Sequence, residues 1–383
     1  MAFGTDAFYR AVHGLAHTAS AQQLSTVSQL LRHLRRRIAV EGPITVAQYM
    51  EDCLVHPKFG YYTTRDPFGM AGDFVTAPEI SQMFGELIGV WTAHIWQDMG
   101  RPNPFNWIEL GPGRGTLSAD ALRVMAGVNG LLDAIRVHLV EVSPELRNKQ
   151  SDLLCTYAPQ WHNDITDLPS NPGIVIANEF FDALPICQYQ LAQDGWHERV
   201  ISMDDDNNLC FALSQQVLRN PPLPFGMDTV RLGDIIEVPI ASLSIIRHLR
   251  NRLMSDGGAA LIIDYGHQRS AVGDTLQAMK GQAYHDILEL PGEADLTAHV
   301  DFQILAETAR EVGVVSWGPI DQGVFLQALG INARAERLMI SANSEQYNSI
   351  HAALRRLTGP DSMGSLFKVM ALTGKDMSPP PAF

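Results

Sequence analysis

The chain contains 383 residues, of which 46% are hydrophobic and 18% are charged, and its formal net charge is −14. This composition is typical of a globular protein with a sizeable core. The negative charge disfavours nucleic acid as a partner, because that binding depends on clustered Lys and Arg. No apolar run approaches the roughly 20 residues of a membrane-spanning helix, so we expect no membrane insertion. The four cysteines are scattered, which favours a reducing compartment and predicts no metal site.

Residues 1–105 are predicted to form an N-terminal helical region that contains a loop rich in Gly, Pro and aromatic residues. Apolar residues recur at helical spacing from Leu24 to Ile38. A second helix should follow Thr45, whose hydroxyl can cap it. Beyond the loop of residues 57–74, Thr76 and Glu79 fit a capping box, so another helix should begin there.

From about residue 106 to residue 330, short apolar runs alternate with helical patterns, which indicates an α/β domain with a parallel sheet covered on both faces. Residues 185–240 look like an inserted β-rich lobe, residues 313–318 and 323–328 like a closing antiparallel pair, and residues 331–383 like a C-terminal extension. The predicted strands are residues 107–110, 136–141, 173–178 and 259–264, and the predicted helices are residues 116–127, 143–156, 242–255 and 301–312.

A glycine-rich turn lies between the first of these strands and the helix that follows it. The turn begins at Glu109 and contains Gly111, Gly113 and Gly115. Glycine lets the chain bend sharply and lets a ligand approach the backbone closely. The Gly-x-Gly-x-Gly spacing, with an acid two residues before the first glycine, is typical of methyltransferases that hold a methionine group. We therefore predict that these four residues bind S-adenosylmethionine; the alternative is a strand-to-helix turn without a ligand.

Two acids stand at the ends of the next two predicted strands. Glu141 ends the second strand, 26 residues after Gly115. This spacing is near the roughly 20 residues after the glycine turn at which an acid can accept hydrogen bonds from ribose hydroxyls. A surface glutamate at the start of a helix is the alternative interpretation. Asp164 lies where a short third strand, between the predicted strands of residues 136–141 and 173–178, should end, and we predict that it meets the adenine.

The fourth strand runs into Asn178, Glu179 and Asp182. Ligands of open α/β sheets bind at the carboxyl ends of the strands, so these side chains should face the target of the methyl group, with Asn178 also contacting the cofactor. Methylation of a guanidinium needs carboxylates that hold the planar cation in place. Glu179 and Asp182 are the predicted catalytic acids, and a buried helix cap is the alternative for Asp182.

The fifth strand ends at Asp264 and is followed by His267. His267 is predicted to accept a proton or to orient a carboxylate, because the ordinary pKa of histidine lies near neutrality. A structural histidine is the alternative. Downstream, Asp301 could cap a helix.

Five separated segments resemble one family in the same order: residues 72–81, 109–117, 178–185, 264–267 and 294–302. The chain resembles, over about residues 25 to 330, the family of the mitochondrial complex I assembly factor that is a protein arginine methyltransferase, together with its bacterial homologues. The resemblance implies S-adenosylmethionine as the cofactor. It also implies a class I methyltransferase Rossmann-like fold, with a mostly parallel seven-stranded sheet, an N-terminal helical lobe and an inserted β-rich lobe. The mitochondrial member makes symmetric dimethylarginine on a complex I subunit.

The expected function is therefore methylation of an arginine side chain of a protein, by resemblance a respiratory complex I subunit or a bacterial counterpart. A small-molecule N- or O-methyltransferase is one alternative, which a narrow pocket closed by residues 61–74 would favour. A cofactor-binding assembly factor that acts by holding a partner is another, which Glu179 facing away from the cleft would favour. The short N-terminus favours a bacterial cytoplasmic protein over one of the mitochondrial matrix, and a homodimer is one assembly that we consider.

Overall fold

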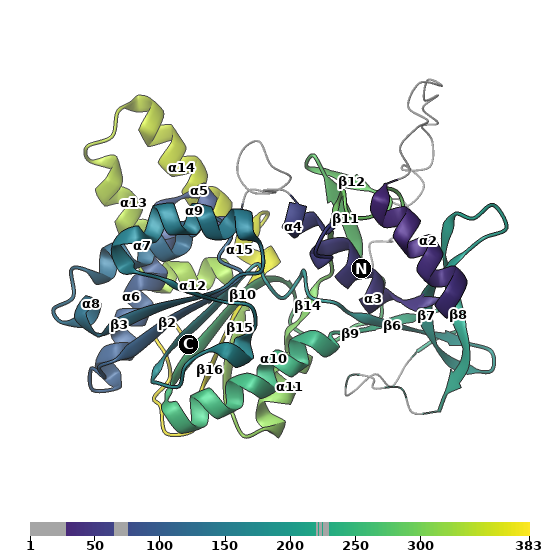
Figure 1. Cartoon of the computed structure of the whole chain (residues 1–383). Helices are drawn as coiled ribbons and strands as arrows, with labels where there is room; N and C mark the ends of the chain where they lie inside the picture. Colours follow the sequence, from purple (N-terminus) through teal and green to yellow (C-terminus); the bar gives the residue numbers. More distant parts are fainter. Residues whose placement is uncertain (1–27, 65–75, 220, 222–223, 225–229) are drawn as a thin grey trace, which may run out of the picture.

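The computed structural model describes residues 28–64, 76–219, 221, 224 and 230–383. These residues form two parts that lie side by side, one built around a large sheet and one around the N-terminal helices (Figure 1). Residues 24–27 of the first predicted helix and residues 65–74 of the predicted loop lie outside the described ranges.

The larger part is built on an eight-stranded sheet with the order β15-β16-β10-β5-β2-β3-β4, and β14 pairs with β10 beside this path. From β4 to β10 adjacent strands run parallel, whereas β16 is antiparallel to both β10 and β15. The strands are β2 (Phe105–Leu110), β3 (Ile135–Val140), β4 (Gln160–His162), β5 (Gly173–Asn178), β10 (Gly258–His267), β14 (Val300–Asp301), β15 (Val315–Asp321) and β16 (Phe367–Thr373).

Helices cover both faces of this sheet, as the alternating pattern predicted (Figure 1). Every residue of β2 and β5 is buried, and successive side chains point to opposite faces. Trp107 and Ile174 face α6, α7 and α12, whereas Ile108 and Val175 face α10 and α11. The helices of this part are α5 (Ala77–Ile80), α6 (Gln82–Asp98), α7 (Thr116–Met125), α8 (Leu131–Ala134), α9 (Pro144–Leu154), α10 (Ile240–Asn251), α11 (Phe302–Glu311), α12 (Gln322–Ala328), α13 (Ile331–Met339), α14 (Ser344–Thr358) and α15 (Met363–Leu366).

The predicted pairing of residues 313–318 with residues 323–328 is wrong. Residues 322–328 form α12, and the strand that pairs with β15 is β16. β16 comes from residues 331–383, which we expected to be an extension, and all of its residues but one are buried. It inserts between β10 and the edge strand β15, so the C-terminal segment contributes an interior strand of the sheet.

The smaller part joins the N-terminal helices to the inserted strands. An antiparallel five-stranded sheet has the order β1-β7-β6-β9, with β8 paired to β7, and a three-stranded sheet has the order β12-β11-β13. The helices are α2 (Gln29–Glu41), α3 (Val46–Val55) and α4 (Tyr61–Thr64), and the strands are β1 (Ile44–Thr45), β6 (Cys187–Ala192), β7 (Gly195–Met203), β8 (Leu209–Leu218), β9 (Ile235–Val238), β11 (Gln277–Lys280), β12 (Ala283–His285) and β13 (Asp295–Thr297).

One core holds this smaller part together. Leu34 of α2 and Tyr49 of α3 are buried in the same cluster as Ile201 of β7 and Leu296 of β13. Thr45 caps α3 in a capping box with Gln48, as expected for its hydroxyl. The N-terminal helices and the inserted β-rich segment, which are far apart in the sequence, therefore form one unit.

The predicted capping box at Thr76 is wrong. The Thr76 side chain caps nothing, and the helix breaks at Ser81, whose hydroxyl instead accepts a hydrogen bond from the Met83 N–H at the start of α6. This break leaves α5 as one short turn, and it frees the Glu79 carboxylate for a contact described below.

Candidate active site

The glycine-rich turn connects β2 to α7 in a conformation that only glycine adopts easily. Gly111, Gly113 and Gly115 have φ angles of 61°, 54° and 85°, in the left-handed region where side chains are strained. A Cβ atom at Gly111 would lie 2.7 Å from the Phe180 ring. The turn therefore packs directly against the residue that follows Glu179.

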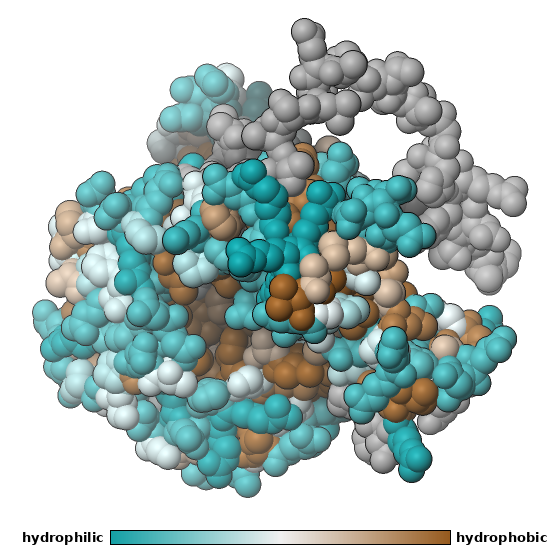
Figure 2. All heavy atoms as spheres, turned by 45° about the vertical axis from the view of Figure 1, so that its right-hand side comes forward, coloured by the Kyte–Doolittle hydropathy of each residue, from teal (hydrophilic) through white to brown (hydrophobic). Residues whose placement is uncertain are grey.

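A cavity of about 290 Å³ lies over this turn, at the carboxyl ends of the parallel strands. Its lining is largely apolar, and Figure 2 shows apolar residues set back in a hollow near the centre of one face of the molecule. Leu54 of α3 and Tyr62 of α4 complete the wall opposite the sheet. The cavity lining thus combines both parts of the molecule, with residues Leu110, Gly111, Gly113, Glu141, Asn163, Asp164, Ile165, Glu179, Phe180 and Ile245 on the sheet side.

Glu141 lines this cavity as a buried carboxylate. Its Oε1 accepts a hydrogen bond of 2.8 Å from the Ser143 N–H, and its Oε2 accepts one of 3.3 Å from Gln150 Nε2. Burial raises its pKa. The same Gln150 amide also donates to the Gly113 carbonyl oxygen at 2.7 Å, so Gln150 ties Glu141 to the glycine turn.

Asp164 lies just beyond β4 and lines the same cavity. Its Oδ1 accepts hydrogen bonds from the Thr166 N–H at 2.8 Å and from the Thr166 hydroxyl at 2.7 Å, and these bonds lower its pKa. Its neighbours Asn163 and Ile165 line the cavity too. The short segment 163–165 therefore forms the end wall of the cavity, opposite the glycine turn.

A second, smaller hollow of about 40 Å³ lies on the other side of the glycine turn. Glu79 lines it, although the sequence suggested only a capping role for this residue; its Oε1 accepts a hydrogen bond of 2.7 Å from the Thr116 hydroxyl. Glu109 lines it as well. The residues around the hollow are Thr76, Pro78, Glu79, Glu109, Gly111, Pro112, Gly113, Arg114, Thr116, Leu117, Asn178 and Glu179.

Glu109 is the acid that precedes the glycines, and it is buried beneath the turn. Its Oε2 accepts a hydrogen bond from the Ser118 hydroxyl, which in turn accepts one of 2.7 Å from the Trp107 indole N–H. Burial raises its pKa to about 8. This chain of hydrogen bonds fixes the carboxyl group of Glu109 between β2 and α7.

Asn178 and Glu179, at the end of β5, lie between the two hollows. Glu179 lines both of them and has a φ angle of 49°, a left-handed conformation that is rare outside glycine and is found often at functional sites. Its Oε1 accepts hydrogen bonds from the Ala77 N–H at 2.8 Å and from Asn178 Nδ2 at 3.3 Å. Burial, with a smaller contribution from Asp182, raises its pKa to about 7.

Asp264 holds this turn in place, which the sequence did not reveal. Its Oδ2 accepts hydrogen bonds from the backbone N–H groups of Phe180, Phe181 and Asp182, at 3.1, 2.9 and 3.2 Å. The side chain is fully buried within β10, beside the end of β5. Burial and the charges of Asp182 and Glu179 raise its pKa.

Removal of the Asp264 carboxyl group should destabilise the fold. In Asp264→Ala, several buried N–H groups lose their acceptor, so we expect a loss of about 3 kcal/mol and a fall in the thermal unfolding midpoint of about 5 °C or more. Asp301→Ala, which removes the N-cap of α11, should lose only about 1 kcal/mol. Differential scanning calorimetry checks both values, and an Asp264 variant as stable as the Asp301 variant contradicts this role.

Asp182 and His267 lie outside the two hollows, since neither lines them. Asp182 is buried and hydrogen-bonded to Tyr265, and burial raises its pKa to about 6. His267 is the last residue of β10, and its Nε2 lies 3.8 Å from Asp301 Oδ2. The structure therefore brings Glu179 together with the glycine turn, Glu141 and Asp164 on the cavity lining, whereas these two predicted catalytic residues do not contribute to that lining.

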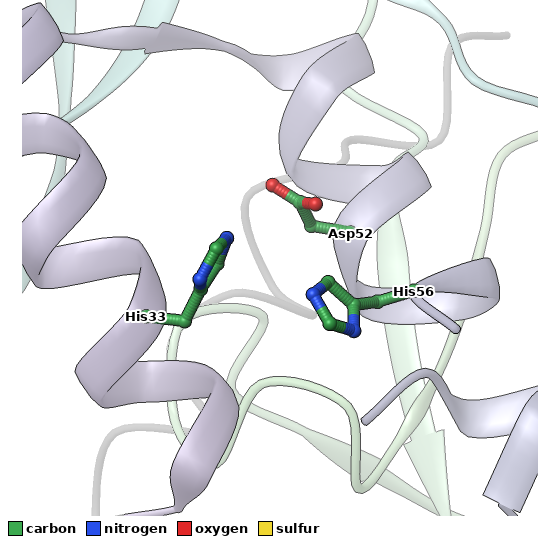
Figure 3. A group of neighbouring side chains, drawn as sticks. All are labelled: His33, Asp52 and His56. Carbon is green, nitrogen blue, oxygen red and sulfur yellow. The ribbon is translucent and has the colours of Figure 1, made fainter. Parts of the chain in front are cut away.

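A group of metal-ligand side chains stands apart from this site. His33 of α2 faces Asp52 of α3 and His56, the residue after α3, with ligand atoms within 4.8 Å of one another (Figure 3). Asp52 Oδ2 already pairs with Arg37 Nη1 at 2.7 Å. His56 Nδ1 accepts a hydrogen bond of 3.2 Å from the Lys58 N–H, which leaves the proton of the neutral ring on Nε2. Asp52 and His56, two of the three candidate metal ligands, therefore already have partners within the protein.

The described part of the chain contains no helix that is both long and apolar enough to cross a membrane.

Comparisons with known proteins agree with this site. Residues 87–320 match the family model of S-adenosyl-L-methionine-dependent methyltransferases. The mitochondrial protein arginine methyltransferase NDUFAF7 of Danio rerio is 38% identical over 378 residues, which cover 92% of this chain and 89% of the relative. The Homo sapiens NDUFAF7 is 37% identical over 373 residues, which cover 90% of this chain and 83% of the relative.

A solved structure is also similar over nearly the whole length. This Burkholderia thailandensis protein, bound to S-adenosylhomocysteine, has a TM-score of 0.80 and 28% sequence identity, covering 92% of this chain and 94% of that chain. A second crystal structure of a Burkholderia thailandensis protein has a TM-score of 0.78 and 29% sequence identity. The chain therefore belongs to the family of S-adenosylmethionine-dependent methyltransferases that includes NDUFAF7, and S-adenosylmethionine is its cofactor.

Proposed function

We propose that this enzyme transfers the methyl group of S-adenosylmethionine to the guanidinium of an arginine side chain in a protein substrate. The observation that carries the proposal is Glu179, an acid held at the end of β5 that lines both hollows beside the glycine turn. The relatives at 37% to 38% identity are named protein arginine methyltransferases, which supports the same substrate class.

The two hollows fit the two halves of the cofactor. The larger one, with the buried Glu141 carboxylate and the 163–165 segment, suits the ribose and the adenine. The smaller one, around Glu109 and Thr116, suits the methionine end. Glycine at positions 111 and 113 leaves the backbone open to close approach. In this arrangement Glu109, Gly111, Gly113, Gly115, Glu141 and Asp164 are the proposed cofactor contacts.

The surroundings of Glu179 favour a cationic acceptor. Asp182 raises the pKa of Glu179 and Arg356 lowers it, and both acids raise the pKa of Asp264, so the end of β5 carries a cluster of three acids whose charges repel one another. A guanidinium lowers the electrostatic energy of such a cluster and can be held by hydrogen bonds from two of its nitrogens. The cofactor supplies an electrophilic methyl group, and the contribution of Glu179 is to hold and align the nitrogen that receives it.

Asp182 has a different role in this proposal from the one expected. It lines neither hollow and accepts a hydrogen bond from Tyr265. We propose that it shapes the charge around Glu179 and does not touch the guanidinium. His267 points to Asp301, so we propose a structural role for it.

The alternatives differ in what they require of the site. An assembly factor that binds the cofactor without catalysis would leave Glu179 away from the cleft, and the placement of Glu179 in both hollows favours the enzyme. A small-molecule acceptor would need a narrow pocket closed by residues 61–74, of which residues 65–74 lie outside the described ranges. Transfer of labelled methyl groups only to small molecules would favour the small-molecule methyltransferase.

Several finer features belong to the same proposal. The strand order β15-β16-β10-β5-β2-β3-β4 supports the class I methyltransferase sheet, with the N-terminal helices and the inserted strands as one added unit. The relatives are named as mitochondrial proteins, which supports the mitochondrial matrix over the bacterial cytoplasm expected from the N-terminus. A respiratory complex I subunit, or its bacterial counterpart, stays the proposed substrate, and a homodimer stays a prediction.

The test is transfer of labelled methyl groups in cell extract. Extracts with and without this protein are incubated with radiolabelled S-adenosylmethionine, and labelled bands are hydrolysed to identify the modified amino acid. We expect at least one band that depends on the protein and yields methylated arginine. Label on another amino acid, or on no protein at all, would contradict the proposal.

The reaction should lose rate in acid. The pKa of Glu179 is raised to about 7, and only its ionised form attracts a cation, so kcat/KM should fall about tenfold per pH unit below about pH 7. The affinity for S-adenosylhomocysteine, measured over the same range, is the control and should change much less. A kcat/KM that stays constant down to about pH 5.5 would show that Glu179 is not the titrating group.

A further inference from the structure

Asn178 carries a buried polar atom with no partner. It is the last residue of β5, is 8% exposed and lines the smaller hollow. Its Nδ2 donates to Glu179 Oε1 at 3.3 Å, whereas its Oδ1 receives no hydrogen bond from the described residues. Buried carbonyl oxygens are nearly always hydrogen-bonded. A donor on a bound molecule would satisfy this one.

Glu179 offers a second acceptor beside it. Oε1 is occupied by the Ala77 N–H and by Asn178 Nδ2, so Oε2 is the oxygen that a ligand can reach. The left-handed backbone conformation at Glu179 orients this side chain. Hydrogen bonds from the N–H groups of Phe180 and Phe181 to Asp264 hold this backbone in place. Two neighbouring residues thus present an amide oxygen and a carboxylate oxygen at the edge of the same hollow.

We propose that Asn178 is a catalytic residue that touches the substrate: its Oδ1 accepts one N–H of the nitrogen that is methylated, while Glu179 Oε2 accepts the other N–H of that nitrogen. This inference rests on the proposed function and replaces the expected role of Asn178 as a cofactor contact. Neighbouring N–H groups of a guanidinium match two acceptors set side by side. A neutral amide adds an acceptor without adding a further negative charge to Glu179, Asp182 and Asp264.

The chemical step balances with these groups. The target nitrogen gives one proton to the Glu179 carboxylate, and its lone pair forms the new N–C bond. The bond between the methyl carbon and sulfur breaks, and its electron pair stays on the sulfur of S-adenosylhomocysteine. The acceptor remains a methylguanidinium cation. A pKa of about 7 suits Glu179 to receive that proton near neutral pH. Asn178 aligns the lone pair with the methyl group by holding the remaining N–H.

The test uses a probe that needs no knowledge of the natural substrate. The probe is an S-adenosylhomocysteine analogue in which a nitrogen carrying a guanidinoethyl arm replaces the sulfur, and a matched analogue carries an uncharged 4-methylpentyl arm. Calorimetry on the full chain gives the affinity for both analogues and for S-adenosylhomocysteine. The gain from the guanidine arm is the ratio of the two analogue affinities.

Asn178→Ala should reduce that gain about tenfold or more, because a hydrogen bond to a charged group is lost. Its affinity for S-adenosylhomocysteine should stay at the native value, which also shows that the variant is folded. Asn178→Asp, which keeps an acceptor oxygen but loses the donor to Glu179, should retain most of the gain. Loss of the gain in both variants would overturn the proposal, because the hydrogen bond to Glu179 would then be the important one.

Two other results have separate meanings. A fall in S-adenosylhomocysteine affinity in Asn178→Ala, with the gain unchanged, would show that Asn178 Oδ1 binds the cofactor and would overturn the inference. No gain from the guanidine arm in the native protein would instead contradict the proposed arginine substrate, and the inference would fall with it.

Discussion

Glu179→Gln should lower kcat/KM for methyl transfer by about 100-fold to 1000-fold, because it removes the charge that holds a guanidinium in a partly enclosed site. The amide is nearly the same size as the carboxylate, so the hydrogen bond from the Ala77 N–H to Oε1 can persist. The affinity for S-adenosylhomocysteine should stay within about threefold of the native value. Initial rates of label incorporation and calorimetry measure the two quantities.

Glu198→Gln is the matched control for this variant. Burial raises the pKa of Glu198 as it does that of Glu179, but Glu198 lies on β7 and lines neither hollow. The control should transfer methyl groups at the native rate. Full activity in Glu179→Gln would remove the acid from the mechanism, and equal losses in both variants would point to a general effect on folding.

Gly113→Val should abolish cofactor binding, with an affinity loss of more than about 100-fold. Gly113 has a φ angle of 54° and lines both hollows, so a branched side chain would be strained and would occupy the space of the ligand. The thermal unfolding midpoint should fall by only a few degrees, because the turn lies at the surface of the cavity. Calorimetric titration with S-adenosylmethionine checks the loss.

Gly100→Val is the control that separates the effect of backbone strain from the effect of blocking the cofactor site. Gly100 has a φ angle of 80°, follows α6, and has open space around an added Cβ atom. This variant should show a similar loss of stability with native cofactor affinity. Binding that is unchanged in Gly113→Val would contradict the assignment of the turn to the cofactor.

The cofactor turn could be predicted because its information is local. The acid at Glu109 and the three glycines lie within seven consecutive residues, and the apolar runs on either side identify the strand and the helix. The carboxyl ends of parallel strands meet at one edge of the sheet, so Glu141, Asp164 and Glu179 could be expected on the same side. The structure places all three on the lining of one cavity.

The acids around Glu179 could not be told apart in this way. Asp182 follows a buried strand and Asp264 lies within one, and the sequence favoured Asp182 because it is three residues from Glu179. The left-handed turn at Glu179 instead directs the backbone N–H groups of residues 180–182 towards Asp264 and the Asp182 side chain towards Tyr265. Glu79 was missed for a similar reason, since its partner Thr116 is far along the chain.

The sequence by itself determined the strand-helix alternation, the cofactor turn and the acids at the strand ends, because each depends on the spacing of residues within a short segment. Only the tertiary structure decided that β16 completes the large sheet, that the N-terminal helices and the inserted strands share one core, and that Asp264 supports Glu179. These features depend on contacts between distant segments. Pairing and packing of that kind are set by the complementarity of whole surfaces, which local periodicity does not encode.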